Sequence, residues 1–116
     1  MQNPENPFIE RIGRAVRELP KRGMAALAVV PGPNLRYLTG LSMHTSERLA
    51  LGLFAPGVKP ALVVPSFEAS RAEQGLGMEA DLFGYTDEGG PQAALASACA
   101  RLGLAGKRIA AESLQM

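Results

Sequence analysis

The apolar positions near the N-terminus follow a helical period. Between residues 8 and 19, apolar side chains recur every three or four positions, and most charged side chains fall outside that stripe. This spacing is typical of an amphipathic helix with one buried face. We predict a helix over about residues 7–22, which Pro20 distorts near its end because proline lacks a backbone donor. The proline- and asparagine-rich residues 1–7 are expected to form a flexible lead-in to one domain over residues 8–116.

The rest of the chain alternates apolar runs with turn residues. The run at residues 24–30 is continuous and ends at a Pro-Gly-Pro turn, which predicts a strand buried on both faces. Further strands are expected at residues 47–55, 59–64, 81–85 and 108–111, of which the first two would pair as a hairpin. Helical segments are expected at residues 34–38, 66–75 with Ser66 as N-cap, and 90–102. The order predicts an α/β fold, a mixed sheet covered by helices.

Composition narrows the class of protein. The chain has 116 residues, the size of one domain, and 47% of them are hydrophobic and 20% charged, which disfavours disorder. No apolar run approaches the roughly 20 residues of a membrane span. One cysteine and one histidine leave no disulfide framework and no Cys/His zinc site. The N-terminus lacks the apolar region of a signal peptide, so we expect a cytoplasmic protein without a membrane partner.

Charge gives little support for a nucleic-acid partner. The chain carries 12 Lys and Arg against 11 Asp and Glu. The predicted first helix is the only basic element, and neither an aromatic platform nor a known nucleic-acid module accompanies it. We therefore expect no nucleic-acid binding.

The common catalytic motifs are missing from the sequence. It contains no nucleophile elbow, no zinc-protease motif and no phosphate-binding loop. His44 and Ser46 could form a base and nucleophile pair; otherwise His44 is a polar loop residue. The acidic residues between positions 79 and 88 do not have the spacing of an EF-hand and are interpreted as solvated loop charge.

A resemblance adds to this picture. The segment PGPNLRYLTGLSMHTSERLALGLF, residues 31–54, resembles the N-terminal domain of the creatinase/prolidase family, whose members include Xaa-Pro dipeptidase and aminopeptidase P. With the later segments PALVVPSFEAS and LGLAGKRIAAES and the Tyr85-x-Asp87 pair, the resemblance covers about residues 8–114. The matching residues of the first segment are Pro33-Asn34, Tyr37-Leu38-Thr39-Gly40 and Glu47-Arg48-Leu49.

The resemblance implies a ribonuclease-H-like mixed sheet of about six strands with helices on both faces. It also implies that peptidase activity belongs to a following "pita-bread" domain, in which carboxylates and a histidine hold a pair of divalent metals, Mn, Co or Zn. None of those ligands can be placed in these residues. We therefore expect no catalytic or metal-binding residue here, and no peptide hydrolysis by the 116 residues alone.

In the family this domain contributes to a homodimer of the full-length protein, and its loops approach the neighbouring subunit's active site. The resemblance implies that residues 43–48 line that substrate mouth, near a bound peptide. Arg48 would bind a peptide carboxylate; the alternative is an internal ion pair at the start of the strand. The other implied lining residues are Met43, His44, Thr45 and Ser46.

Four residues of the resemblance make up a family-motif turn: Asn34, Tyr37, Thr39 and Gly40. For Asn34 and Tyr37 the alternatives are an ordinary turn and a packed ring. Two other functions stay open. One is a stand-alone ligand-binding or regulatory α/β module with a pocket near residues 34–48, and the other is a small enzyme that works through His44 and Ser46.

Overall fold

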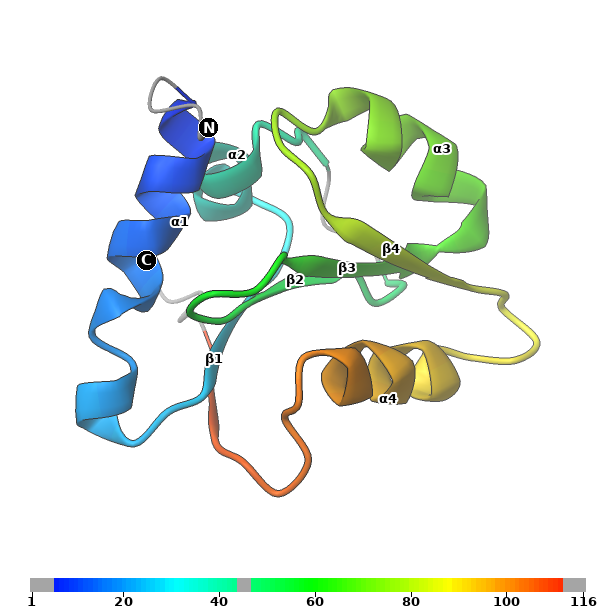
Figure 1. Ribbon diagram of the computed structural model, residues 1–116. Helices are drawn as coiled ribbons and strands as arrows, with labels where there is room; N and C mark the ends of the chain where they lie inside the picture. The colour runs from blue at the N-terminus through cyan, green and yellow to red at the C-terminus, as the bar shows by residue number, and fades with distance from the viewer. Residues whose placement is uncertain (1–5, 44–46, 112–116) are drawn as a thin grey trace.

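The computed structural model describes residues 6–43 and 47–111. They form a mixed sheet of five strands in the order β4-β3-β2-β1-β5 (Figure 1). The pairs β1–β2 and β2–β3 are antiparallel, whereas β3–β4 and β1–β5 are parallel. The mixed sheet is as predicted; the described residues form five strands, where the resemblance implied about six. The strands are β1 Ala26–Val29, β2 Leu51–Phe54, β3 Ala61–Pro65, β4 Asp81–Tyr85 and β5 Ile109–Ala111.

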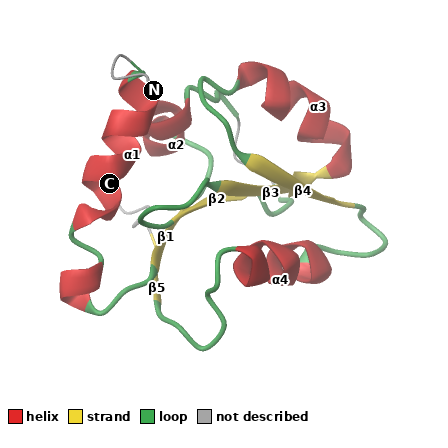
Figure 2. Ribbon diagram, viewed as in Figure 1, coloured by secondary structure: helices red, strands yellow, loops and turns green. Residues whose placement is uncertain are grey.

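Helices cover both faces of the sheet, as predicted. Figure 2 shows α1, α2 and α3 on one side of the strands and α4 on the other. The core is accordingly split, because successive strand residues point to opposite faces. In β3, Leu62 and Val64 belong to the cluster under α1–α3, and Ala61 and Val63 to the cluster over α4. The helices are α1 Pro7–Arg17, α2 Pro33–Thr39, α3 Ser66–Gly75 and α4 Gln92–Arg101.

The first helix begins as predicted but ends early. The side chain of Asn6 caps it by accepting hydrogen bonds from the backbone N–H groups of Phe8 and Ile9, at 2.9 and 3.3 Å. The predicted end near residue 22 is wrong: α1 stops at Arg17, and a separate 3₁₀ turn, η1, spans Pro20–Arg22. The physical reason is Pro20, which has no N–H to continue the α-helical ladder.

Three further expectations are corrected. The strand expected from residue 47 begins only at Leu51, although it pairs with β3 as a hairpin as predicted. The first strand is not buried on both faces along its length, because Leu27 and Ala28 are only half-buried beside the three-residue β5. Ser66 is the first residue of α3, not its N-cap, and no side chain caps that helix.

Candidate functional site

Two of the motif residues build the turn that ends α2. Thr39 is fully buried, and its hydroxyl donates to the carbonyl of Leu35 at 2.7 Å and accepts from the N–H of Leu41 at 3.1 Å. Gly40 follows with φ of 81°, the left-handed conformation that favours glycine. Its N–H closes the helix on the carbonyl of Arg36 at 2.7 Å. The turn therefore fixes the direction in which residues 41–43 leave the helix.

A second contact holds this turn against the loop before β4. The N–H of Gly77 donates to the carbonyl of Thr39 at 2.7 Å. The ring of Phe8 lies over both Gly40 and Gly77, so closely that a Cβ atom at Gly77 would overlap the ring. Glycine is thus required at position 77 by close approach and at position 40 by backbone conformation.

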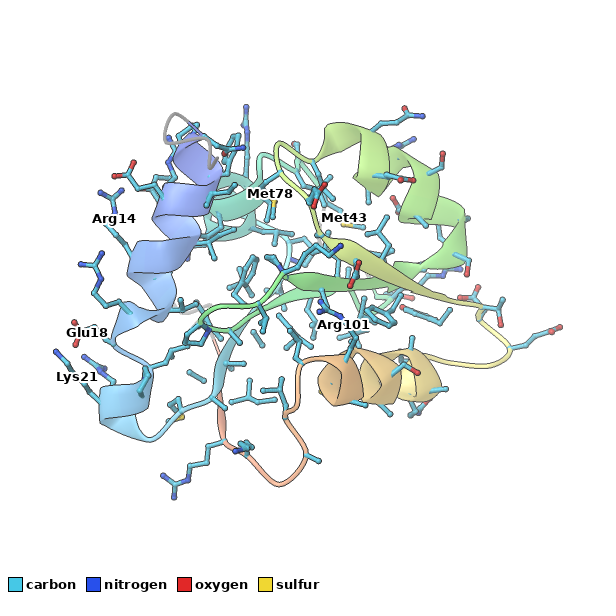
Figure 3. The ribbon with its side chains drawn as sticks, in the orientation of Figure 1. Arg14, Glu18, Lys21, Met43, Met78 and Arg101 are labelled. Carbon is cyan, nitrogen blue, oxygen red and sulfur yellow. The ribbon has the colours of Figure 1, made fainter. Side chains whose placement is uncertain are left out.

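The segment that the resemblance placed at a substrate mouth starts from a packed residue. Met43 is half-buried and packs against the core cluster on the α1–α3 side of the sheet (Figure 3). His44, Thr45 and Ser46 lie outside the described residues. Their role at a substrate mouth, and the role of His44 and Ser46 as a catalytic pair, stay predictions.

Arg48 forms a bidentate ion pair with Asp87. Its Nε and Nη2 each donate to one carboxylate oxygen at 2.8 Å, and both side chains are largely exposed. The hydrogen bond to Arg48 lowers the pKa of Asp87 below its ordinary value, and the bond to Asp87 raises the pKa of Arg48. Arg48 thus forms the ion pair within the chain that the sequence analysis gave as an alternative, and this pair lies on the surface. Contact between Arg48 and a peptide carboxylate stays a prediction.

Tyr85 ties the same segment to the end of β4. Its hydroxyl donates to the carbonyl of Leu49 at 2.6 Å, and the side chain is buried. Burial, and next the negative charge of Asp87, raise the pKa of Tyr85 above its ordinary value. Tyr85 and Asp87 therefore hold two consecutive residues, 48 and 49, shortly before β2.

Sequence reasoning missed Phe67, which lies beside this ion pair. The Arg48 guanidinium carbon is 5.1 Å from the centre of the Phe67 ring, and Phe67 is 67% exposed. The available signal was its position in α3, outside the stripe that places Ala69 and Ala72 against the core. An aromatic ring off the buried stripe of a short helix is a candidate for contact with another group.

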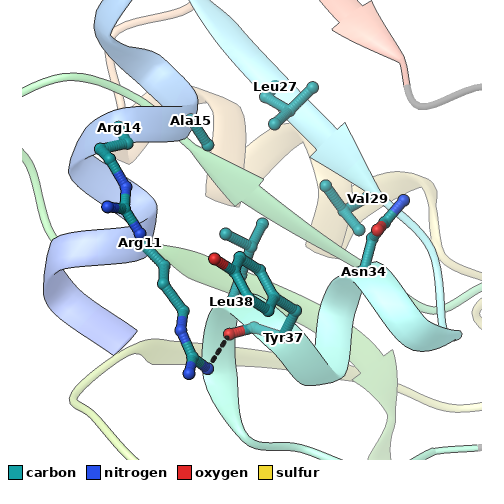
Figure 4. Close-up of a pocket in the computed structure, with 8 residues that line it drawn as sticks. All are labelled: Arg11, Arg14, Ala15, Leu27, Val29, Asn34, Tyr37 and Leu38. Carbon is teal, nitrogen blue, oxygen red and sulfur yellow. Dashed lines mark hydrogen bonds between the residues drawn. The ribbon is translucent and has the colours of Figure 1, made fainter. Parts of the chain in front are cut away.

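Asn34 and Tyr37 lie in a different place. From α2 they line a cleft of about 450 Å³ between α1, α2 and β1, in which Asn34 lies beside Val29 and the Tyr37 ring lies nearer α1 (Figure 4). The Tyr37 ring is 50% exposed and stacks on the guanidinium of Arg11, 4.3 Å from its centre, so it is not a core ring. Met43, Glu47 and Arg48, the described residues of the 43–48 segment, do not line this cleft.

The acidic residues between positions 79 and 88 are partly paired, which corrects their interpretation as solvated charge. Asp81 lies 2.8 Å from Arg101 and 3.2 Å from Lys59, and Asp87 binds Arg48. Within residues 6–43 and 47–111, no three His, Cys, Asp or Glu side chains are grouped as metal ligands. No helix in this described part of the chain has the length and apolarity needed to cross a bilayer.

Comparison with known proteins shows which family and which relatives this chain resembles. A family model for the creatinase/prolidase N-terminal domain matches residues 11–116. A probable dipeptidase, PepE, of Mycobacterium bovis is 37% identical over 76 residues, which are 65% of this chain and 20% of that protein. The chain thus spans about a fifth of the length of the curated relatives it matches.

Solved structures share the fold. Dipeptidase PepE from Mycobacterium ulcerans matches with a TM-score of 0.80 and 24% identity, over 100% of this chain and 31% of that one. The N-terminal domain of Xaa-Pro dipeptidase from Lactobacillus brevis has a TM-score of 0.79 and 19% identity, over 91% of this chain and 78% of that one. A dipeptidase from Pyrococcus horikoshii OT3 matches at 0.75 with 27% identity, over 91% and 29% of the two chains.

Proposed function

We propose that this chain, which belongs to the creatinase/prolidase N-terminal domain family, is the non-catalytic N-terminal domain of an Xaa-Pro dipeptidase-like metallopeptidase. The observation that carries the proposal is the match of the family model to residues 11–116, nearly the whole chain. The names of its relatives, dipeptidases and an Xaa-Pro dipeptidase domain, support the substrate class.

The dinuclear metal site of this proposal, with Mn, Co or Zn, belongs to a catalytic domain that follows the N-terminal one. The described residues do not fit such a site, since no group of three potential ligands is assembled and the Asp81 and Asp87 carboxylates are engaged by cations. We therefore assign to these residues a structural and gating role, and no step of the hydrolysis.

The gating role would be carried by the segment between Met43 and Arg48. In a homodimer of the longer protein, this segment would line the partner subunit's substrate mouth and limit entry to short peptides. Its two ends support the idea, because Met43 packs on the core while Arg48 and Leu49 are held by Asp87 and Tyr85. Because Met43, Arg48 and Leu49 are already held in place, these three residues lose little entropy when a ligand binds beside them.

Assays of the product of the longer reading frame test the enzymatic part. We expect the gene to continue past codon 116, and its product, supplied with Mn²⁺, to hydrolyse Xaa-Pro dipeptides. We expect residues 1–116 alone not to do so. A stop directly after codon 116, or a longer product that leaves Xaa-Pro dipeptides intact, would overturn the proposal.

An Arg48→Ala variant of the longer product tests the gating part. We expect a raised KM for Xaa-Pro dipeptides and a weaker preference for dipeptides over longer peptides, with a smaller change in kcat. Arg71→Ala is the matched control, since Arg71 is also exposed but lies on α3 outside the ion pair. Equal KM and equal length preference in both variants would refute gating by this segment, whereas metallopeptidase activity would stand.

A further inference from the structure

The cleft between α1, α2 and β1 has the size and the walls of a small-molecule site. Its volume of about 450 Å³ falls within the roughly 300–1,000 Å³ typical of ligand pockets. As Figure 4 shows, Arg11 and Arg14 line it from α1, Leu27 and Val29 from β1, and the polar groups of Asn34 and Tyr37 from α2. One wall is thus cationic and another apolar.

Within residues 6–43 and 47–111, no acidic side chain in the cleft balances its positive charge. Arg11 and Arg14 are three residues apart and so project from the same side of α1. None of the cleft-lining residues that the structure describes is acidic. Glu18, which follows the last residue of α1, forms an ion pair with Lys21 instead, with 3.6 Å between its Oε1 and the Lys21 Nζ. Among the described residues Arg14 takes part in no ion pair. Two guanidinium groups without a carboxylate attract an anion, and a planar carboxylate suits their fork of donors.

Arg11 is held in place before any ligand arrives. Its Nη1 donates to the carbonyl of Tyr37 at 2.9 Å, and its guanidinium stacks between the rings of Tyr37 and Phe8, at 4.3 and 5.2 Å from their centres. That bond uses one of the five N–H donors of an arginine, and the others remain for a second acceptor. A pre-positioned donor reduces the entropy lost on binding.

The floor of the cleft supplies apolar surface to the same ligand. Leu27 lines the cleft and is only half-buried, although its strand has neighbours on both sides. We propose that this cleft binds a small organic carboxylate, its carboxylate held by Arg11 and Arg14 and its apolar body lying on Leu27 and Val29. The site is independent of the proposed peptidase function, and neither stands or falls with the other.

Titration of the 116-residue chain with hexanoate, followed by heteronuclear NMR, tests the proposal. We expect saturable shifts of the backbone amide signals of Ala15, Leu27 and Val29. Hexanamide, which has the same apolar body without the charge, should bind roughly tenfold more weakly or worse, as expected for loss of a charge-assisted contact. Equal binding of the two compounds, or hexanoate shifts spread over the basic surface without saturation, would overturn the proposal.

Substitutions separate the cleft from general positive charge. Arg14→Gln should weaken hexanoate binding roughly tenfold, and because Arg14 is exposed the variant should keep its fold. Arg17→Gln is the control, with the same charge change on the same helix outside the cleft. An equal effect of both variants on hexanoate binding would contradict the site. The same titration of the longer reading-frame product should also shift the signals of Ala15, Leu27 and Val29, and their absence would contradict the site too.

Discussion

The guanidinium of Arg48 and the carboxylate of Asp87 are joined by two hydrogen bonds of 2.8 Å across 39 residues of sequence. The pair connects the chain just before β2 to the turn just after β4. Since Tyr85 reaches the neighbouring carbonyl of Leu49, that end of the sheet is held by two side chains of different chemistry. One contact is exposed and titrates in acid, and the other is buried and titrates in alkali.

The ion pair predicts a pH dependence of stability on the acid side. Because Arg48 lowers the pKa of Asp87, the stabilisation is fully present above the ordinary carboxyl pKa of 3.8 and is lost as the pH falls through the lower folded value. The difference in unfolding free energy between wild type and Asp87→Asn should therefore shrink as the pH falls below that value. Urea titrations at a series of pH values measure it, with Glu88→Gln as control. A constant difference down to the lowest pH would contradict the prediction.

Removal of the Tyr85 hydroxyl should destabilise the fold. In Tyr85→Phe the part-buried carbonyl of Leu49 loses its hydrogen-bond donor, which should lower the free energy of unfolding in urea by about 1 kcal/mol. Burial raises the pKa of Tyr85 above 10.0, so the wild type should also lose stability as the pH rises through that folded value. The Phe variant should lack that alkaline loss. Tyr37→Phe, with a half-exposed ring, is the control and should unfold like wild type.

The hydroxyl of Thr39 should matter more than its size suggests. Thr39→Val keeps the shape of the side chain but leaves the buried N–H of Leu41 without its acceptor and removes the hydroxyl bond to the carbonyl of Leu35. We expect a loss of about 1–3 kcal/mol in the free energy of unfolding. Ser42→Ala, an exposed neighbour, should change it little. Thermal and urea unfolding of the two variants measure the contrast, and equal stabilities would refute it.

Two glycines should respond in opposite directions to the same substitution. Gly77→Ala places a methyl group against the Phe8 ring and should destabilise by about 1–3 kcal/mol, the usual cost of overpacking. Gly13→Ala, inside α1 with open space around its Cβ position, should stabilise by up to about 1 kcal/mol, since alanine favours the helix. Melting temperatures of the pair measure this. A neutral Gly77→Ala would mean that the Phe8 ring moves aside freely.

The parts of the fold that local pattern controls could be predicted. The prediction for β3 agrees within two residues, because all five of its residues are buried and form one apolar run, and β4 has the predicted bounds. The wrong predictions concern element boundaries that depend on contacts with a distant segment of the chain. β2 begins late because residues 48 and 49 are held by Asp87 and Tyr85 instead of entering the ladder.

The candidate site was less accessible to sequence reasoning. The turn at Thr39 and Gly40 could be found because glycine and threonine there have local causes. The partner of Arg48 could not be identified by spacing, since the two residues meet only after the three strands β2, β3 and β4 have aligned. The cleft at Arg11 could not be predicted either. From the sequence alone, its arginines are typical of the solvated face of a helix, and only the fold brings α2 beside them.

The pairing of β1 with β5 has a consequence during synthesis on the ribosome. Leu27 emerges early, but Ala110, its register partner, is among the last described residues to be made. Until then one edge of β1 exposes unpaired backbone groups, which other chains can recruit. The sheet can be completed only when almost the whole described domain has left the exit tunnel. Such non-local pairing favours slow, late folding, during which the nascent chain needs protection from aggregation.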